Sequence, residues 1–426
     1  MAVQLPANQE PKWLDSGEII KGRYEVSQMV SAGGFGQVYW ATDLKTGHCV
    51  AVKAEKKGCK ISLLKEEAMI VSKINRSAFK RFTHIRAPII RLYDYIETDS
   101  LKMMVMSMCG PNLRELKKST EFDKFSPITS FWIAKKMICA LKTLHNFGWI
   151  HRDIKPANFT IGLGREGGHR LFIVDFGLAR RYMGSDGSLK PIRESCNFRG
   201  TIRYASLNAH KRRDLSRSDD LWSVYYIAVE NILGKLPWRA SVDRDEVGKM
   251  KSDINLIDLK YNDMHSAPKS YIYLKNHLEL NGFYHEPKYD VLIQQFDGEL
   301  CALGYHSRYN NTLDWESIDS TSKIMEHKKI AVSMEMLKNM NSFERINNYF
   351  YNFSSNSNSQ MPEIRENFYN MTKENARMDS TPSYQPAFTS GSRQKFGVSN
   401  FYESNRTPHH LKTTNNSHFR RQQQFF

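Results

Sequence analysis

The segment HRDIKPAN, at residues 151–158, combines side chains that suit the transfer of a phosphoryl group. Asp153 supplies a carboxylate that can orient an attacking hydroxyl and accept its proton. Lys155 adds a positive charge where negative charge is redistributed during transfer. Asn158 can bind a metal ion. Because Pro156 favours a loop over a helix interior, the segment predicts a catalytic loop.

The segment VDFG, at residues 174–177, predicts a further metal ligand. Asp175 is a hard oxygen ligand that suits Mg²⁺ bridging two phosphates, and Gly177 lets the chain turn sharply after it. A DFG tripeptide alone is a common turn. Here it ends an apolar run and follows Asn158 by 17 residues, a spacing that is not typical of an isolated turn.

The segment SAGGFGQV, at residues 31–38, predicts a phosphate-binding loop. Gly33, Gly34 and Gly36 have no Cβ, so their backbone N–H groups can approach phosphates closely. The alternative is a glycine-rich hairpin turn that binds nothing. Ser31 stands where the usual GxGxxG pattern has its first glycine, which could stiffen this loop and weaken nucleotide binding.

Lys53, in VAVK, lies on a predicted strand and would point inward, where it needs a carboxylate partner. Glu67, on the following predicted helix, is placed to hold Lys53 against nucleotide phosphates. Glu66 is a competing partner. The alternative is a solvated lysine beside a glutamate on a helix surface, since lysines are mostly exposed.

Alternating and helical hydrophobic patterns predict the elements that position these motifs. Leu64, Ala68 and Val71 share one face of a predicted helix at 63–74. After residue 108 the pattern becomes mainly helical. The predicted strands cover residues 23–30, 36–43, 48–55, 89–97 and 102–108. A small strand-rich lobe followed by a larger helical lobe is therefore expected.

The composition is that of a soluble globular chain. Hydrophobic residues make up 40% of the 426 residues and charged residues 25%, which excludes a wholly disordered, collagen-like or membrane-embedded protein. No apolar run is long enough to span a bilayer, so we expect no membrane insertion. The first residues lack the pattern of a secretory signal, and none of the six cysteines forms a CxxC pair. We therefore expect reduced thiols and a location in the cytoplasm, the nucleus or both.

The net charge of +16 should attract anionic partners such as nucleic acid, acidic protein segments and phosphate groups. The basic residues are spread out, without a long basic run or an aromatic-basic repeat, so nucleic acid is an unlikely partner. Docking on acidic surfaces through the C-terminal tail remains an alternative.

Taken in order, these motifs resemble the eukaryotic protein kinase superfamily. The segment FRGTIRYASLNAH, at 198–210, is similar to the casein kinase I branch, and residues 217–239 are closest to its tau-tubulin kinase group. The resemblance covers about residues 20–318 and implies an α+β, bilobal protein kinase fold. This fold has a small antiparallel β-rich N-lobe with a C-helix and a larger, mainly α-helical C-lobe. The implied function is that of an ATP-dependent serine/threonine protein kinase that uses ATP and Mg²⁺.

The resemblance also implies roles for individual residues. Asp153 would be the catalytic base, Lys155 the lysine that contacts phosphate, and Asn158 with Asp175 the metal ligands. Thr201 could hydrogen-bond with Lys155 and Asp153. Among the implied cofactor-binding residues, Val38 and Ala51 would enclose the adenine. Met106 would lie at the back of the adenine pocket, and Met108 would lie in the hinge between the lobes. The full set is Val30, Gly33, Gly34, Gly36, Val38, Ala51, Lys53, Glu67, Met106 and Met108.

Two further positions follow from the same resemblance. Asp220 would brace the catalytic loop from a buried helix, although a carboxylate at a helix N-terminus is also common for electrostatic reasons alone. Thr160 occupies a place where many kinases have a larger apolar residue under the adenine. Neither this change nor Ser31 removes a catalytic group.

The resemblance extends to substrates, because related kinases often favour acidic or already phosphorylated serine and threonine sites. Arginine and lysine side chains bind phosphate and carboxylate well. The alternative is that such residues form a solvated basic face. The expected anion pocket consists of Arg203, Arg239, Lys249 and Lys251.

The chain is expected to have three parts, namely an N-terminal extension at 1–19, the kinase domain at 20–318, and a polar, mostly disordered tail at 319–426. One helical face in the tail, formed by Ile330, Met334 and Leu337, is a possible exception. We expect a monomer that acts on protein substrates. The alternative is a pseudokinase that docks partners through the large lobe or the tail, which the intact motifs disfavour.

Overall fold

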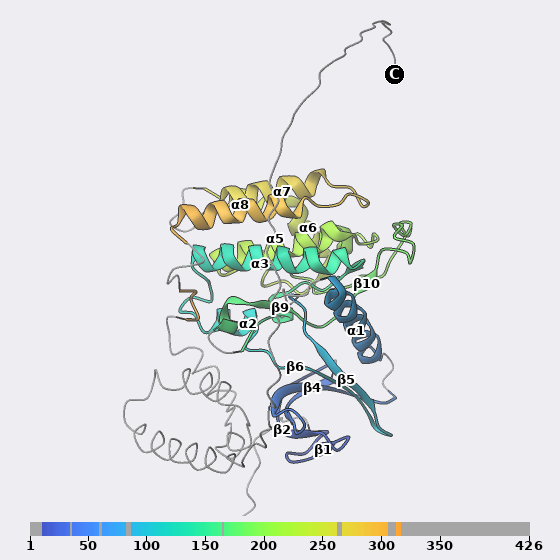
Figure 1. Ribbon diagram of the computed structural model, residues 1–426. Helices are drawn as coiled ribbons and strands as arrows, with labels where there is room; N and C mark the ends of the chain where they lie inside the picture. Colours follow the sequence, from blue (N-terminus) through green and yellow to red (C-terminus); the bar gives the residue numbers. More distant parts are fainter. Residues whose placement is uncertain are drawn as a thin grey trace, which may run out of the picture. The chain divides into compact units, whose positions relative to one another are not determined.

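The structure of the protein, a computed structural model, describes residues 11–34, 36–58, 62–81, 87–163, 166–261, 266–305 and 312–316. These residues form a small β-rich lobe and a larger helical lobe (Figure 1). The arrangement confirms the predicted α+β, bilobal fold. The expected tail at 319–426, with its helical face, lies outside the described residues.

The small lobe is built on a six-stranded sheet with the strand order β1-β2-β3-β4-β6-β5. All neighbouring strands in it are antiparallel. A single helix, α1 (Leu64–Arg81), lies between β4 and β5 in the chain. The strands are β1 (Ile19–Ile20), β2 (Tyr24–Gly33), β3 (Gly36–Asp43), β4 (His48–Lys56), β5 (Leu92–Glu97) and β6 (Leu101–Ser107).

Strand β4 shows how alternation sorts side chains between the two faces of this sheet. Val50 and Val52 are buried in a cluster on the face away from α1, whereas Lys53 points to α1 and bonds Glu67 there. Leu64, Ala68 and Val71 of α1 are buried, as their helical spacing predicts. The helix therefore packs its apolar face inward and carries Glu67 with it.

The large lobe is mainly helical, and α7 and α8 cover the side of α3 and α5 that faces away from the sheet (Figure 1). Its helices are α2 (Leu113–Lys118), α3 (Pro127–Asn146), α4 (Leu207–His210), α5 (Arg217–Leu233), α6 (Arg244–Asp253), α7 (Lys269–Leu280) and α8 (Tyr289–Ala302). Short strands and 3₁₀ helices connect them, namely β7 (Trp149–Ile150), η1 (Pro156–Asn158), β8 (Phe159–Ile161), η2 (Glu166–His169), β9 (Leu171–Ile173), β10 (Arg180–Arg181) and η3 (Leu256–Asp258).

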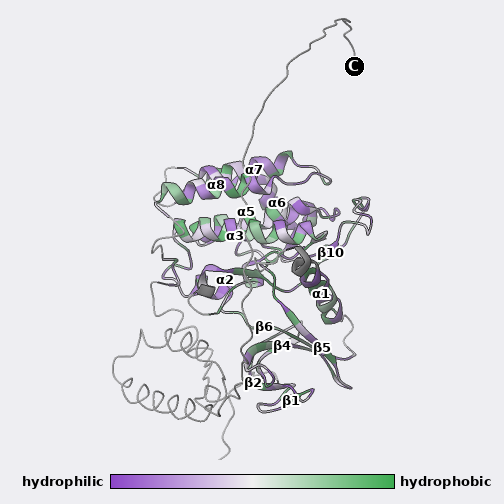
Figure 2. Ribbon diagram, in the orientation of Figure 1, coloured by the Kyte–Doolittle hydropathy of each residue, from purple (hydrophilic) through white to green (hydrophobic). Residues whose placement is uncertain are grey.

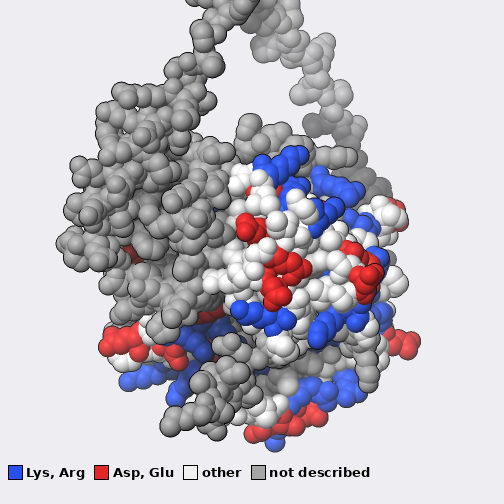
Figure 3. Space-filling model, turned by 90° about the horizontal axis from the view of Figure 1, so that it is seen from below, with Lys and Arg blue, Asp and Glu red and all other residues white. Residues whose placement is uncertain are grey.

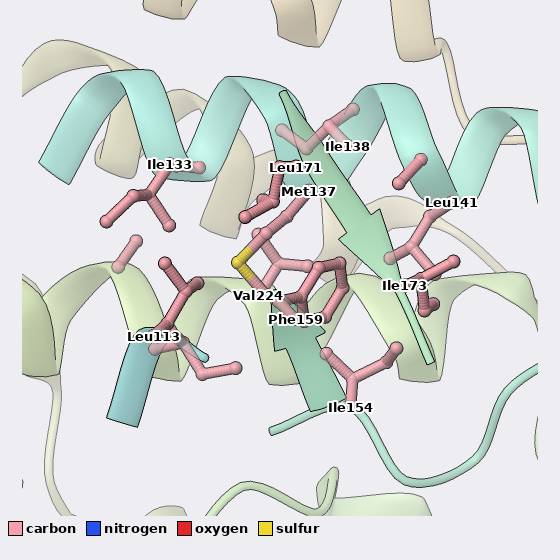
Figure 4. Packing of buried hydrophobic residues seen from close by; sticks show 14 of the residues in the cluster. Leu113, Ile133, Met137, Ile138, Leu141, Ile154, Phe159, Leu171, Ile173 and Val224 are labelled. Atoms are coloured by element: carbon pink, nitrogen blue, oxygen red, sulfur yellow. The ribbon is translucent and has the colours of Figure 1, made fainter. Parts of the chain in front are cut away.

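The core of the large lobe lies directly behind the catalytic-loop segment. Figure 4 shows Met137 and Leu141 of α3 beside Phe159 and Ile173 of the β8–β9 hairpin. Ile154, which lies inside the HRDIKPAN segment, is buried in the same cluster. Burying such a side chain contributes about 1.5–3 kcal/mol, so the loop is anchored by its own apolar residue.

The surface and the helices show ordinary globular patterning. Hydrophobic and hydrophilic residues share the same helices of the large lobe, as expected for helices with one buried face (Figure 2). On the described part of the face in Figure 3, basic and acidic residues lie interspersed. No helix in the described ranges is long and apolar enough to cross a membrane.

Residues 11–18 pack onto the small lobe. The backbone N–H of Trp13 donates to the Tyr39 hydroxyl at 2.8 Å, and Leu14 is buried in the cluster on that face of the sheet. The Gln37 side chain is fully buried and donates to the Pro11 carbonyl at 3.0 Å. This segment therefore contributes to the packing of the lobe that carries the glycine-rich hairpin.

Candidate active site

Lys53 links the two lobes through carboxylates on both sides. Its Nζ lies 2.6 Å from Glu67 Oε2 on α1 and 3.2 Å from Asp175 Oδ1 in the large lobe. The Phe176 N–H donates to Glu67 Oε1 at 3.3 Å, which adds a second link between α1 and the VDFG segment. Glu66, the competing partner, is exposed. Helical geometry explains the difference, because Glu67 shares the buried face of α1 with Leu64 and Ala68.

The charges of this cluster stabilise one another. Burial alone would lower the pKa of Lys53, but Glu67 and Asp175 raise it above its ordinary value. Burial would raise the pKa of Asp175, but Lys53 holds it below its ordinary value. Burial raises the pKa of Glu67, and the charge of Lys53 opposes this. The cluster therefore presents a charged lysine and an ionised Asp175 at neutral pH.

Asp153 is oriented by three neighbours. Thr201 Oγ1 donates to Asp153 Oδ1 at 2.7 Å, and Lys155 Nζ lies 2.6 Å from Asp153 Oδ2. The Asn158 amide donates to the Asp153 backbone carbonyl at 2.9 Å. The structure thus brings Lys155, Asn158 and Thr201, three of the residues that the sequence analysis singled out, together around Asp153.

Asp220, at the N-terminus of α5, holds the catalytic loop from behind. Its buried carboxylate accepts hydrogen bonds from the backbone N–H groups of His151 at 2.7 Å and Arg152 at 2.8 Å. His145 Nε2 lies 2.9 Å from the same carboxylate. Burial would raise the pKa of Asp220, but its hydrogen bond with His145 and the charges nearby lower it. The carboxylate therefore stays ionised and fixes the loop.

The backbone is strained at two points beside the site. Arg152 has a φ of 67° and Asp175 a φ of 65°, in the left-handed region that residues other than glycine rarely adopt. Each such residue costs about 1–3 kcal/mol and persists only where surrounding contacts impose it. Arg152 is held by Asp220 and donates from Nε to the Leu178 carbonyl at 2.8 Å. The two unusual backbone conformations thus lie directly before Asp153 and at Asp175.

One hollow in the structure is lined by Lys53 and by three of the carboxylates described above. Lys53 and Glu67 line it from the small lobe, and Asp153, Asp175 and Gly177 line it from the large lobe. Carboxylates and a lysine from four different segments therefore face one space.

Four of the cofactor-binding residues implied by the resemblance lie on β2, β3, β4 and β6, and a fifth, Met108, lies just after β6. Val38 pairs with Lys53 across β3 and β4, and Ala51 pairs with Met106 across β4 and β6. Val30 lies in β2 where the pairing with β3 shifts register, and Met108 directly follows the end of β6. The strand pairings therefore place Val38 beside Lys53, and Met106 beside Ala51, which lies two residues before Lys53 on β4.

The glycine-rich hairpin joins β2 and β3. The backbone conformation and the close approach of β4 require a glycine at its last glycine position, Gly36. Gly36 has a φ of 123°, and a Cβ at this position would lie 2.2 Å from the Ala54 carbonyl oxygen on β4. A Cβ on Gly33 or Gly34 would meet nothing within 4 Å. Gly36 therefore allows β3 to approach β4 closely, next to the pair of Val38 and Lys53.

On the expectation that this hairpin binds the phosphates of ATP, replacing Gly36 with alanine should raise the KM for Mg-ATP by about tenfold, which corresponds to about 1.4 kcal/mol. The added methyl group must push β3 away from β4 beside Lys53. Gly298→Ala on α8 is the matched control, because a Cβ there meets nothing within 4 Å. Steady-state kinetics over a range of ATP concentrations tests this, and equal KM values for both variants would show that Gly36 plays no such role.

The four residues of the expected anion pocket have different surroundings. Arg203 Nη1 lies 3.9 Å from Glu230 Oε1, and Arg203 also contacts the Arg239 carbonyl. Lys249 is exposed. The ammonium of Lys251 is buried and donates to the backbone carbonyls of Ile202 and Ala205. The structure therefore brings Arg203 and Arg239 together but binds the Lys251 ammonium internally.

An ion cluster that the sequence analysis missed fixes the segment after VDFG. Asp214 is buried, and Arg193 Nη2 lies 2.8 Å from its Oδ1. Arg180 Nη1 contacts the same oxygen. Burial would raise the pKa of Asp214, but the two arginines lower it. No pattern in the sequence distinguishes Asp214 from its neighbours, because its partners lie 21 and 34 residues away.

The donor set fits a magnesium ion that arrives with a nucleotide. Asn158 uses its amide nitrogen for the Asp153 carbonyl, which leaves its amide oxygen for a metal. Asp175 is ionised and supplies carboxylate oxygen. Mg²⁺ typically takes one or two such oxygens together with substrate phosphates and water. Within the described residues no group of three or more His, Cys, Asp or Glu side chains could hold a metal.

Comparisons with known proteins agree with this geometry. Residues 24–308 match the protein kinase domain family. A probable serine/threonine-protein kinase of Dictyostelium discoideum is 33% identical over 301 residues, which are 71% of this chain and 58% of that protein. A putative casein kinase I of Caenorhabditis elegans is 30% identical over 239 residues, covering 56% of this chain and 68% of that protein. The chain thus spans less than two thirds of the Dictyostelium relative. The family match covers well over half of the chain, and the chain therefore belongs to the protein kinase family.

Proposed function

We propose that the protein transfers the γ-phosphoryl group of ATP to serine and threonine hydroxyls of protein substrates. The observation that carries this proposal is the simultaneous contact of Lys53 with Glu67 and Asp175, at 2.6 and 3.2 Å, beside the oriented Asp153. This arrangement combines a phosphate-binding lysine, a metal-binding carboxylate and a proton acceptor in one hollow. The relatives described as serine/threonine kinase and casein kinase I support the same activity.

In the proposed reaction Lys53 binds phosphate oxygens and is kept in place by Glu67. Asp153 orients the acceptor hydroxyl and takes its proton as the oxygen attacks the γ-phosphorus, while the bond from this phosphorus to the β,γ-bridging oxygen breaks and ADP leaves. Lys155, 2.6 Å from Asp153, stabilises negative charge on the phosphoryl oxygens. Asn158 and Asp175 would hold Mg²⁺, which neutralises charge on the nucleotide phosphates when bound. Most of the rate enhancement then comes from positioning and electrostatics.

We further propose that the kinase is of the casein kinase I type, similar to the tau-tubulin kinase group, and that it prefers acidic or phosphorylated sites. Arg203 is the basic residue best placed for this, because it lies in the segment 201–205 next to Thr201, with its side chain 38% exposed. A partly exposed arginine beside the acceptor site can bind a carboxylate or a phosphate of the substrate.

Arg203→Ala is therefore expected to lower kcat/KM for acidic and phosphorylated peptides by about tenfold and for neutral peptides by much less. Arg213→Ala, which removes an exposed arginine in the same lobe, is the matched control. The measurement compares the three kinds of peptide with both variants. An equal loss on all peptides would argue against Arg203 as a specificity residue.

The proposed activity itself is tested with the full chain, Mg-ATP labelled at the γ-phosphate, and Ser/Thr and Tyr peptides. We expect label on phosphoserine and phosphothreonine after acid hydrolysis. Label on phosphotyrosine alone would contradict the proposed acceptor class. Binding of ATP without transfer to any peptide would instead favour a binding module.

A further inference from the structure

The ammonium of Lys251, on α6, is enclosed by acceptors. Only 6% of the residue is exposed. Its Nζ donates to the carbonyl oxygens of Ile202 at 2.8 Å and Ala205 at 2.6 Å, and it lies 3.2 Å from His210 Nε2. An ammonium has three donors and accepts no hydrogen bond. These three neighbours match its donors one to one.

The His210 ring is set up to accept from Lys251. Its Nδ1 lies 2.9 Å from the Arg244 carbonyl oxygen, which can only accept, so Nδ1 carries the proton of the neutral ring. Nε2 is then free of a proton and faces the ammonium. Burial and the charge of Lys251 lower the pKa of His210 to about 4, which keeps the ring neutral at physiological pH.

Two aromatic rings complete the enclosure. The Lys251 Nζ lies 4.8 Å from the centre of the Tyr226 ring and 5.3 Å from that of Trp238. Burial lowers the pKa of Lys251 to about 7. The two ring faces and the three acceptors act in the opposite direction, because they interact best with the protonated amine. Trp238 also donates from Nε1 to the Arg203 carbonyl at 2.9 Å.

The carbonyls bound in this way belong to the segment that carries Thr201. Within it the backbone N–H groups of Tyr204 and Ala205 both donate to the Thr201 carbonyl, each at 2.9 Å. Thr201 Oγ1 in turn donates to Asp153 Oδ1 at 2.7 Å. A chain of direct contacts therefore runs from Lys251 through this turn to the Asp153 carboxylate.

We propose that Lys251 is a positioning residue for phosphoryl transfer, which holds the turn at 201–205 so that Thr201 keeps Asp153 aligned with the acceptor hydroxyl. Lys251 touches neither the substrate nor the nucleotide. This inference rests on the proposed kinase function. It also replaces the expected role of Lys251 as a direct ligand of substrate anions, because all its donors are used inside the protein.

The first test compares Lys251→Met with Lys260→Met in the full chain. Lys260 is an exposed lysine shortly after α6, so both variants lose one positive charge. We expect Lys251→Met to lower kcat for peptide phosphorylation by about tenfold or more, since small misalignments of reacting groups are costly, and to leave the Kd of Mg-ATP within about twofold. Lys260→Met should leave both unchanged. An unchanged kcat in Lys251→Met would overturn the proposal.

A double-mutant cycle with Thr201→Ala separates positioning from general loss of stability. If Lys251 acts through Thr201, adding Lys251→Met to Thr201→Ala should lower kcat by less than about threefold more. If kcat of the double variant falls by the product of the two factors found for the single variants, the proposal is overturned. Should Lys251→Met fail to unfold cooperatively, Trp238→Phe takes its place in the cycle, because it removes the donor to the Arg203 carbonyl and keeps an aromatic ring.

Hydrogen exchange gives a readout that does not depend on activity. We expect the backbone N–H groups of Tyr204 and Ala205 to exchange about tenfold faster or more in Lys251→Met than in the wild type, and at the wild-type rate in Lys260→Met. Unchanged exchange in Lys251→Met would overturn the proposal even if activity fell. If the wild-type protein transfers no phosphate, the proposed function fails, while the exchange rates still decide whether Lys251 holds the turn.

Discussion

Replacing Asp153 with asparagine is expected to lower kcat for peptide phosphorylation by a factor of about 10² to 10⁴. An amide has nearly the shape of the carboxylate but cannot accept the proton of the substrate hydroxyl. It also replaces one of the two oxygens that now bind Thr201 and Lys155, at 2.7 and 2.6 Å. The loss should therefore fall on the chemical step.

Steady-state kinetics together with calorimetric titration of Mg-ATP checks this result. The Kd of Mg-ATP should change by less than about threefold in Asp153→Asn, because Asp153 acts on the acceptor and not on the nucleotide. Asp253→Asn, which changes an exposed aspartate at the C-terminal end of α6, is the matched control and should keep the wild-type kcat. If Asp153→Asn kept more than about a tenth of the wild-type kcat, Asp153 could not be the proton acceptor.

The second large effect is expected for Lys53→Met. Without this lysine the nucleotide phosphates lose their cation from the small lobe, and kcat/KM for ATP should fall by at least about 10²-fold. The variant also leaves the buried Glu67 without its partner at 2.6 Å. Removing one member of a buried ion pair typically costs about 3–5 kcal/mol of unfolding free energy. The thermal midpoint should therefore drop as well.

A second substitution separates the two consequences of losing Lys53. In Lys53→Met/Glu67→Gln the uncompensated carboxylate is gone, so we expect most of the lost unfolding free energy to return while kcat/KM stays low. Lys57→Met, at an exposed lysine on the same lobe, controls for the loss of charge. Thermal melts and kinetics of the four proteins test this. Recovery of activity in the double variant would show that Lys53 serves only to neutralise Glu67.

Local patterns in the sequence were sufficient for the fold class and for much of the site. The alternation in β4 puts Val50 and Val52 on one face and Lys53 on the other, and this follows directly from strand geometry. The helical spacing in α1 places Glu67 on the face of Leu64 and leaves Glu66 exposed. Such features depend on residues close in the chain, but the sequence analysis left Glu66 open as a partner of Lys53, and the structure decides for Glu67.

Contacts between distant segments could not be predicted in the same way. Asp214 binds Arg180 and Arg193, which lie 34 and 21 residues before it in the sequence. Lys251 donates a hydrogen bond to the carbonyl of Ile202, which lies 49 residues before it. The family resemblance implies that Lys251 faces a substrate anion, and the alternative is a solvated basic face, since lysines are mostly exposed. Only the packing of α6 against the turn at 201–205 shows that the donors of Lys251 are occupied. The packing of residues 11–18 could not be predicted from local patterns either, because it depends on the buried Gln37 and Tyr39.

A single-turnover measurement tests most directly whether the hollow between the lobes performs phosphoryl transfer. Wild-type protein in excess over γ-labelled Mg-ATP is mixed with a serine peptide, and labelled peptide and bound ATP are followed together. The account predicts that label passes from bound ATP to the serine hydroxyl in the wild type. In Asp153→Asn the label should remain on bound ATP. Tight binding of ATP by the folded wild-type protein without any transfer, or equal transfer rates in both proteins, would contradict it.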